Sequence, residues 1–470
     1  MAYKTVFLSV RQLGDLVRTK QVSPVELAET FLSRLETLGP EYNAVVTLTR
    51  DRALRQARQA EQEILSGRYR GPLHGIPFGG KDLLATSEGI PTTWGAIPFR
   101  DQTFDYDATV LRKLEEAGAV LVAKLAMVEL AGGMGYRQPN ASLTGPGINP
   151  WNKNAWSGGS SSGSGSAVAA GLVPFAIGSE TFGSILSPAG NCGVAGLRPT
   201  YGRVSRYGAM ALSWTLDKLG PLCLMADDCG LVLDAIAGHD PNDPSTTKRP
   251  YRYDAADSPG RRFRLGVLKD VTDGAQEVVQ ANFRESLRVL EQVATIEEVE
   301  MLVDFPSMEV TRTILNAEAA SAFEELVESG RTAELTAPED RFGGYPRLAV
   351  LATDYLRALR LRGIMAREAD EVLSRYDALV APTRATVATA LNEETRSAAR
   401  GITRDVMGAV GNGAGLPAIS VPNGFGAGGL PTGIQFMGRA YDENSVLAVA
   451  CAYQSLTDWH HRHPPDLSGG

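Results

Sequence analysis

Histidine and cysteine are scarce in this chain of 470 residues, which contains five histidines and four cysteines. The cysteines, Cys192, Cys223, Cys229 and Cys451, form no C-x-x-C pair and are too few for a disulfide framework. A reduced compartment, the cytoplasm, is therefore expected. No H-E-x-x-H sequence is present either, so a metal site is not expected.

Long apolar runs and clusters of positive charge are also missing. No apolar stretch approaches the ~20 residues of a membrane helix, and the N-terminus lacks the apolar core of a signal peptide. The formal net charge is −8, and no lysine- or arginine-rich run resembles a nucleic-acid-binding stripe. The sequence thus predicts no membrane partner and no nucleic-acid partner, and no cofactor is expected.

The overall composition is that of a globular protein, with 43% hydrophobic and 21% charged residues. From residue 71 onward, short apolar runs alternate with helical patterns. Residues 120–123 and 173–177 are predicted as strands, and residues 109–116 as a helix. This alternation predicts an α/β fold in which helices flank both faces of a central mixed β-sheet.

Changes in these patterns divide one expected domain, 1–470, into parts. Residues 305–375 are charged and largely helical, and are predicted as a helical cap inserted into the domain. Short apolar runs at 378–381 and 418–421 predict strands, and 444–454 predicts a helix. The expected parts are N-terminal helices (1–70), a core with the motifs described next (71–240), a polar surface connection (241–263), the cap (305–375) and a return to the core sheet (376–470).

Residues 157–166, SGGSSSGSGS, contain only serine and glycine. This composition is typical of a flexible linker. The run also matches the G-x-S-x-G elbow of serine hydrolases, with Ser161 as nucleophile. That elbow requires an acid and then a histidine downstream, and only His239 or the histidines of the C-terminal tail are placed to serve. No Gly-Lys-Ser/Thr closes the run, so a Walker phosphate loop is excluded.

A serine can be activated without histidine when a neutral lysine acts as its base. Lys81 follows an apolar, glycine-rich segment in GIPFGGKD (75–82), and burial there would lower its pKa. In GSETFGSIL (178–186), a glycine-containing turn before Ser184 can direct several backbone N–H groups to one point. Taken singly, each segment has a simpler explanation: a surface lysine paired with Asp82, and an ordinary strand-to-helix turn.

Taken together, these segments resemble the amidase signature hydrolases. Members typically carry G-I-P-x-x-x-K-D, G-G-S-S-G-G-S and G-[ST]-D-x-G-G-S-I-R, and this chain has GIPFGGKD, GGSSSGSGS and GSETFGSIL, followed by SPAGNCGVAGLRPTYGRVS. The separation of 24 residues between Ser160 and Ser184 also suits the family. So do APT (381–383) and GLPAISVPNGF (415–425). The resemblance extends over roughly residues 5 to 460 and rests on several separate motifs.

This resemblance implies a single α/β domain of the amidase signature type and a role for each matching residue. Ser184 would be the nucleophile, Ser160 the bridging serine in a cis peptide bond after Gly159, and Lys81 the base behind it. Such a site would cleave a C–N bond through a seryl acyl-enzyme that water then resolves. The implied oxyanion hole consists of the backbone N–H groups of Thr181, Phe182, Gly183 and Ser184.

Several positions depart from the family pattern and bear on the substrate. Glu180 and Phe182 replace an aspartate and a glycine, and Leu186 and Ser187 stand where an arginine is frequent. Because members that act on small carboxylate-bearing amides often use an arginine nearby, such substrates are disfavoured. The expected substrate pocket consists of Met134, Gly135, Tyr136, Arg137, Phe182 and Leu186. These side chains favour a hydrophobic or aryl substrate; the simpler alternative is that Phe182 and Leu186 pack in the core.

The expected activity is hydrolysis of a hydrophobic or aryl amide, as in an aryl acylamidase, and carbamate (urethane) or ester cleavage would follow the same acyl-enzyme chemistry. The expected partners are this small-molecule amide, carbamate or ester and water, bound to a monomer or homodimer. The alternative is the glutamine-hydrolysing amidase subunit of a tRNA-dependent amidotransferase, which requires polar glutamine recognition and partner subunits. In a third, non-enzymatic interpretation, the Gly/Ser run is a linker in a scaffold protein.

Overall fold

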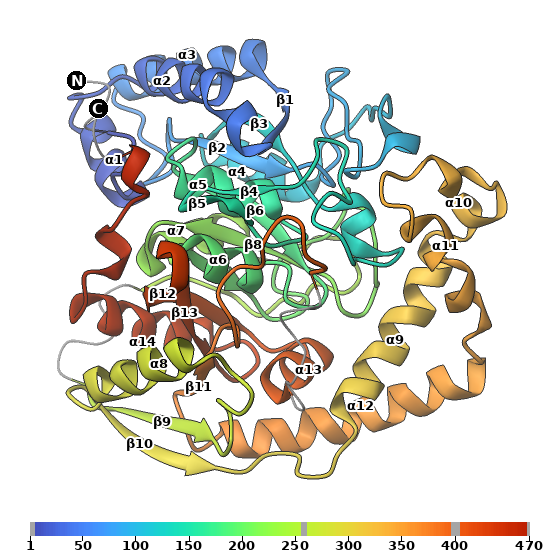
Figure 1. Cartoon of the computed structure of the whole chain (residues 1–470). Coiled ribbons are helices and arrows are strands. Elements are labelled where there is room, and N and C mark those ends of the chain that lie inside the picture. Colours follow the sequence, from blue (N-terminus) through green and yellow to red (C-terminus); the bar gives the residue numbers. More distant parts are fainter. Residues whose placement is uncertain (1–4, 255–260, 396–404, 468–470) are drawn as a thin grey trace.

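One large mixed sheet organises the molecule (Figure 1). The structure, a computed structural model, describes residues 5–254, 261–395 and 405–467. Residues 1–4, 255–260, 396–404 and 468–470 lie outside the described part. They are portions of the predicted N-terminal helices, surface connection and return to the sheet. Within that part, parallel pairs join β2 to β3 and β6, and β9 to β10 and β11, while the other neighbours are antiparallel. In spatial order the strands are β1 (Val45–Leu48), β3 (Val120–Leu125), β2 (Pro77–Lys81), β6 (Phe175–Glu180), β8 (Lys218–Cys223), β7 (Ala195–Arg198), β12 (Ala418–Phe425), β13 (Pro431–Met437), β11 (Ala378–Pro382), β9 (Phe263–Leu268) and β10 (Ala294–Val299).

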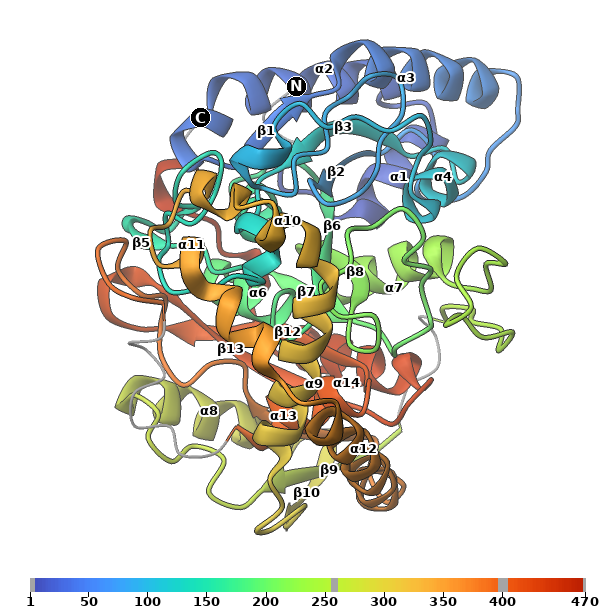
Figure 2. The same ribbon diagram turned by 90° about the vertical axis from the view of Figure 1, so that its right-hand side faces the viewer.

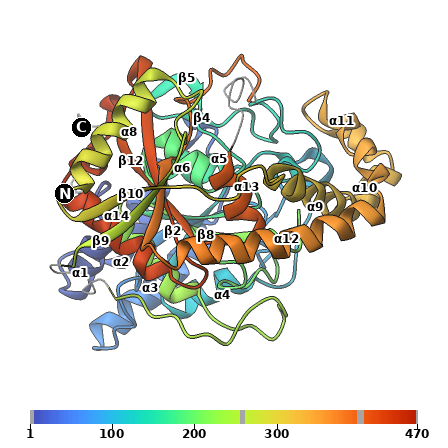
Figure 3. The same ribbon diagram turned by 90° about the horizontal axis from the view of Figure 1, so that it is seen from below.

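Helices cover both faces of this sheet, because both faces are apolar (Figures 1 and 3). Along β3, Leu121 packs in one apolar cluster, whereas Val120 and Val122 pack in another. Since side chains alternate across a strand, an uninterrupted apolar run produces two faces that must be buried. The first cluster is covered by α1 (Val10–Arg18), α4 (Thr109–Glu116), α7 (Ala226–Ile236), α8 (Glu277–Leu290) and α14 (Glu443–Ser455). The second is covered by α5 (Ser162–Ala169) and α6 (Leu186–Cys192), and α2 (Pro24–Thr37) and α3 (Arg50–Leu65) contact both.

The predicted fold class, an α/β domain with a mixed sheet flanked by helices, is confirmed. Strands occur where residues 120–123, 378–381 and 418–421 predicted them, and helices at 109–116 and 444–454. The strand predicted at 173–177 instead begins at Phe175, because Pro174 has no N–H group to donate to the sheet. The short hairpin of β4 (Ile148–Asn149) and β5 (Asn152–Trp156) lies outside the main sheet.

The expected helical cap lies between β10 and β11. It contains α9 (Ser307–Ala322), α10 (Glu324–Glu328), α11 (Asp340–Gly343) and α12 (Ala352–Leu373). These helices, yellow to orange, stand at the right of Figure 1 and face the viewer in Figure 2. Of these helices, α9 and α12 pack on α13 (Val406–Gly413). At the upper end, a Cβ on Gly343 would lie 1.3 Å from the carbonyl oxygen of Met134, so the cap backbone packs directly on the body.

Every helix in the described residues is too short or too polar to cross a lipid bilayer. Within the same residues, histidine, cysteine, aspartate and glutamate side chains form no group of three that could hold a metal ion. All four cysteines are free thiols, and Cys192, Cys223 and Cys229 are buried.

Candidate active site

Lys81 ends β2, a central strand of the sheet, and its side chain is 0% exposed. Its Nζ donates hydrogen bonds to the hydroxyls of Ser160 at 2.7 Å, Ser179 at 2.9 Å and Ser161 at 3.0 Å. Asp82 is paired elsewhere, since one of its oxygens lies 3.0 Å from Nζ of Lys124. Lys81 is therefore a buried lysine surrounded by hydroxyls, and the simpler explanation of a surface ion pair with Asp82 is wrong.

This environment favours the neutral amine of Lys81. Burial lowers its pKa to about 7, and the attraction of Asp217 and Glu180 offsets only part of that effect. In the described part of the chain, no carboxylate lies within 4.0 Å of Nζ. At neutral pH a large fraction of the molecules thus carries an uncharged amine that can accept a proton from a hydroxyl.

Residues 157–166 do not form a linker. All ten are buried, and α5 begins within the run at Ser162. The peptide bond between Gly159 and Ser160 is cis, as the resemblance implied. A Cβ on Gly163 would lie 2.5 Å from both the N–H nitrogen of Ala126 and the carbonyl oxygen of Ala44. Glycine is needed here because other backbone segments approach closely, not because the chain is flexible.

The segment around Ser184 forms the turn from β6 to α6. Gly183 has a φ of +84°, a conformation that glycine adopts easily. The carboxylate of Glu180 accepts hydrogen bonds from the N–H groups of Ile185 at 2.8 Å and Leu186 at 3.0 Å. Its other oxygen binds Arg198 at 2.8 Å, and both side chains are buried. Glu180 thus holds the start of α6 and the residue before it in place.

The predicted oxyanion-hole residues, 181–184, directly precede the two residues that Glu180 holds. In the described part of the chain, the N–H groups of Phe182, Gly183 and Ser184 have no hydrogen-bond acceptor. Thr181 is anchored by its side chain, which donates to Asp217 at 2.6 Å. The position of a Cβ on Gly183 has no atom within 4 Å. The turn therefore has unused backbone donors and open space beside Gly183, two features that an oxyanion hole requires.

The backbone of the Gly/Ser run contacts the turn that carries Ser184. The N–H group of Ser161 donates to the carbonyl of Ser184 at 3.4 Å, while Ser160 faces Lys81. The histidines that the elbow would need form other contacts: Nδ1 of His239 lies 3.2 Å from the Thr246 hydroxyl. In the tail, the rings of His460 and His461 pack against each other, and His463 stacks on Phe7. This arrangement favours a lysine–serine site over the G-x-S-x-G elbow with its histidine.

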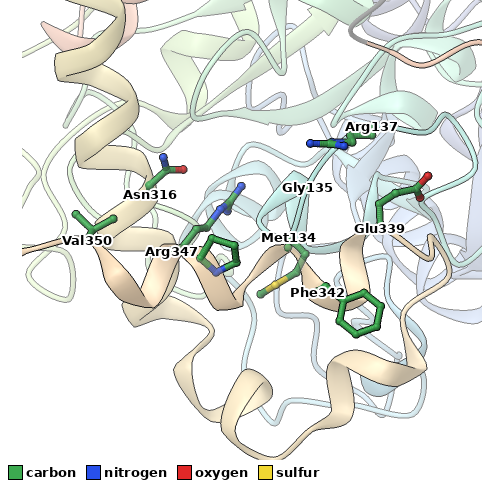
Figure 4. A pocket seen from close by; sticks show the side chains of 10 residues that line it. Met134, Gly135, Arg137, Asn316, Glu339, Phe342, Arg347 and Val350 are labelled. Carbon is green, nitrogen blue, oxygen red and sulfur yellow. The ribbon is translucent and has the colours of Figure 1, made fainter.

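Three residues of the predicted substrate pocket line a cavity of about 390 Å³ between the body and the cap (Figure 4). Met134, Gly135 and Arg137 come from the body, and Phe342 and Arg347 are among the residues that the cap contributes. The lining does not include Tyr136, Phe182 or Leu186.

Those three residues lie in different surroundings. Tyr136 packs edge-on against Trp156, and its hydroxyl oxygen would lie 2.8 Å from a Cβ on Gly159. Phe182 is half-buried beside the turn. Leu186 is 5% exposed and packs in an apolar cluster with Met407 and Leu416, which supports the simpler alternative of core packing for Leu186.

A larger cavity, of about 600 Å³, borders the site on a side that sequence reasoning missed. Ser179 and Thr181 form part of its wall, next to the Lys81 amine and the predicted oxyanion hole. Tyr207, Met210 and Trp214 are among the further lining residues. Residues 201–217 contain no serine–lysine motif of their own, so only the tertiary structure shows that they lie next to the site.

Lys218 is a second buried lysine near the turn that the sequence did not single out. Its Nζ donates to Oδ1 of Asn412 at 3.0 Å and to the carbonyl of Thr181 at 3.5 Å. Burial lowers its pKa to about 7, and the positive charge of Arg198 acts in the same direction. Lys218 therefore supports the turn from the side of β8.

The fold and this buried lysine–serine cluster place the chain among α/β enzymes with an amidase-type site. A family model described as Amidase matches residues 26–447, which is most of the chain. The chain therefore belongs to the amidase family, the amidase signature enzymes, and it is a C–N amide hydrolase of that family.

Known relatives differ in the amide that they act on. The chain is 36% identical to a glutamyl-tRNA(Gln) amidotransferase subunit of Moorella thermoacetica, over 97% of this chain and 98% of that protein. It is similar in structure to a peptide amidase from Stenotrophomonas maltophilia, with a TM-score of 0.85, 30% identity and 98% coverage of each chain. A bacterial aryl acylamidase matches with a TM-score of 0.83 and 25% identity, over 97% of this chain and 98% of that one.

Proposed function

We propose that the chain hydrolyses an amide through an acyl-enzyme formed on Ser184, with Ser160 as the bridging serine and Lys81 as the base. The observation that carries this proposal is the buried Lys81 amine, 2.7 Å from the Ser160 hydroxyl and with a pKa of about 7. A buried lysine without a carboxylate partner is costly to the fold, and such groups are concentrated at functional sites.

The proposed reaction moves one proton along two hydroxyls. Ser184 Oγ attacks the amide carbonyl while its proton passes to Ser160, and the Ser160 proton passes to Lys81. The N–H groups of the 181–184 turn stabilise the oxyanion of the tetrahedral intermediate. The relay then runs in reverse, the leaving amine takes the proton, and the C–N bond breaks. Water repeats the sequence on the ester and releases the acid.

For the substrate, the identity to the amidotransferase subunits, which extends over almost the whole chain, favours the alternative over the hydrophobic-amide prediction. We therefore place glutamine first, as the amide hydrolysed within a tRNA-dependent amidotransferase. In that case other protein chains are partners in addition to the small-molecule substrate. A hydrophobic or aryl amide is the second candidate, supported by Tyr207, Met210 and Trp214 in the cavity next to the site. Carbamate and ester cleavage stay predictions.

A substrate panel separates these candidates. The purified chain alone is offered glutamine, aryl anilides, aryl carbamates and aryl esters, and release of ammonia, amine or phenol is measured. Ammonia release from glutamine, increased by partner subunits, supports the first candidate. Efficient anilide hydrolysis by the isolated chain with no activity on glutamine overturns it in favour of the second.

The rate of acylation is expected to rise with pH around neutrality. Because Lys81 must be neutral to accept the proton, and its pKa is about 7, kcat/KM increases as pH rises through 7. At pH 6, kcat/KM is expected to be about tenfold lower than on the plateau at high pH. Stopped-rate assays on one uncharged amide between pH 5.5 and 9 give the profile. A flat profile over this range contradicts the assignment of Lys81 as base. The variant Lys218→Met, which removes the other lysine with a pKa of about 7, is the control and is expected to retain the same midpoint.

A further inference from the structure

An arginine lies beside the nucleophile turn although the sequence around Ser184 contains none. Arg384 follows the end of β11, and its Nη1 donates a hydrogen bond to the hydroxyl of Ser187 at 2.7 Å. The two residues are 197 positions apart in the chain. The preceding residue, Thr383, packs along the same helix, since a Cβ on Gly190 would lie 2.9 Å from its Cγ2 atom.

Ser187 places this guanidinium close to the reacting serine. The N–H group of Ser187 donates to the carbonyl of Gly183 at 2.8 Å, so residues 183–187 close one hydrogen-bonded turn that leads into α6, which begins at Leu186. Residues three apart on such a turn share a face, and their Cβ atoms are about 5–6 Å apart. Ser184 and Ser187 are therefore close neighbours across this turn.

The guanidinium of Arg384 is only partly used by the protein. Its Nε is buried and has no hydrogen-bond partner among the described residues, and no carboxylate in that part of the chain lies within 4.0 Å. Burial is the main influence on the pKa of Arg384 and lowers it below the ordinary value of a guanidinium, while the charges of Tyr136 and Asp405 offset only part of that effect. A guanidinium whose Nε–H is buried and unused is unfavourable unless an anion completes it.

We propose that Arg384 binds a carboxylate of the substrate and makes the enzyme selective for amides that carry one. With Nη1 bonded to Ser187, the Nε–Nη2 edge remains, and this edge is the part of a guanidinium that binds a carboxylate through two parallel hydrogen bonds. The inference rests on the proposed function, because it assigns a substrate class to the Ser184 site. It also replaces the sequence argument against carboxylate-bearing amides, since the arginine is present but comes from a distant segment.

The test uses substrates that differ only in charge. Succinyl- and glutaryl-4-nitroanilide carry a terminal carboxylate, and their terminal carboxamides are neutral counterparts of nearly the same size. For Arg384→Met, kcat/KM is expected to fall about 10- to 100-fold on the two acids and less than about threefold on the carboxamides. Arg384→Lys is expected to retain part of the preference for the acids that Arg384→Met loses. Lysine keeps the positive charge but cannot form the two parallel hydrogen bonds of a guanidinium.

Binding provides a readout that needs no turnover. Isothermal titration calorimetry of the same four compounds with Ser184→Ala protein is expected to show tighter binding of the acids, and the added Arg384→Met change is expected to remove that difference. Equal binding of acids and carboxamides to Ser184→Ala protein, or an equal loss for both in Arg384→Met, overturns the role of Arg384. Failure of the proposed function is recognised separately, as hydrolysis that Ser184→Ala does not affect.

Discussion

The variant Ser184→Ala is expected to lose nearly all amide hydrolysis, with kcat/KM reduced about 10⁴- to 10⁶-fold. The reason is that every chemical step of the proposed reaction passes through the ester on Ser184 Oγ. The turn itself should persist, since Glu180 holds it through the N–H groups of Ile185 and Leu186 and not through the Ser184 side chain. The measurement is the initial rate of an anilide or of glutamine, with the acyl-enzyme of the unaltered protein trapped and located by mass spectrometry.

Ser162, in the Gly/Ser run that also contains Ser160, provides a matched control. The Ser162 hydroxyl is buried and has no hydrogen-bond partner among the residues that the structure describes. Ser162→Ala is therefore expected to retain activity within a few-fold of the unaltered protein, whereas Ser160→Ala, which breaks the proton relay, is expected to lose it. Ser184→Ala protein that is as active as the Ser162→Ala control would refute the assignment of the nucleophile.

Lys81→Met is expected to lower kcat/KM by about 10²- to 10⁴-fold, the range that a general base contributes. Methionine fills a similar volume but cannot accept the proton of Ser160. The residual activity should also lose its dependence on pH near 7, because the base that titrates there in the unaltered protein is absent. A variant with a near-normal rate and the original pH profile would exclude Lys81 as the base.

The same variant is expected to be no less stable than the unaltered protein. Folding lowers the pKa of Lys81 from its ordinary 10.5 to about 7, so the unfolded state holds a proton that the folded state releases. This effect costs stability at all pH values below about 7, and the cost shrinks as pH rises from 7 toward 10.5. Denaturant unfolding at pH 6 and pH 9 tests it: the gain from Lys81→Met should be larger at pH 6.

Lys124→Met is the control for losing a buried lysine. Lys124 is 0% exposed like Lys81, but it is paired with the buried carboxylate of Asp82 at 3.0 Å. Removing it leaves that carboxylate without its partner, and a loss of about 3–5 kcal/mol in the free energy of unfolding is expected. A similar loss in Lys81→Met would show that Lys81 serves the fold and not the reaction.

Much of the secondary structure could be predicted because it depends on neighbouring residues. The apolar run at 120–123 is β3 and the pattern at 109–116 is α4, and both are determined by periodicity within a few residues. The predicted start of β6 was two residues too early, because Pro174 has no N–H group to donate to the sheet although the run around it is apolar. The sheet order, in which β2 pairs with β6 and β11 with β13, depends on long-range packing that no local pattern encodes.

The candidate site shows the same division. GIPFGGKD, GGSSSGSGS and GSETFGSIL identified Lys81, Ser160 and Ser184 before any contact was known, because each segment carries a reactive side chain and the glycines that its backbone needs. Composition was misleading for residues 157–166, which have the content of a linker but are buried throughout. A glycine that allows close approach and a glycine that allows flexibility are identical in the sequence, and only their neighbours distinguish them.

The sequence by itself determined the family, the α/β class and the three residues of the predicted relay, since these are properties of short segments and their spacing. Only the tertiary structure decided that Lys81 is fully buried among hydroxyls, that a cavity lined by residues of the 201–217 segment borders the site, and that Arg384 reaches Ser187 from 197 residues away. The physical reason is that burial, pKa and charge pairing arise from what surrounds a side chain, and these surroundings are assembled from strands and loops far apart in the chain.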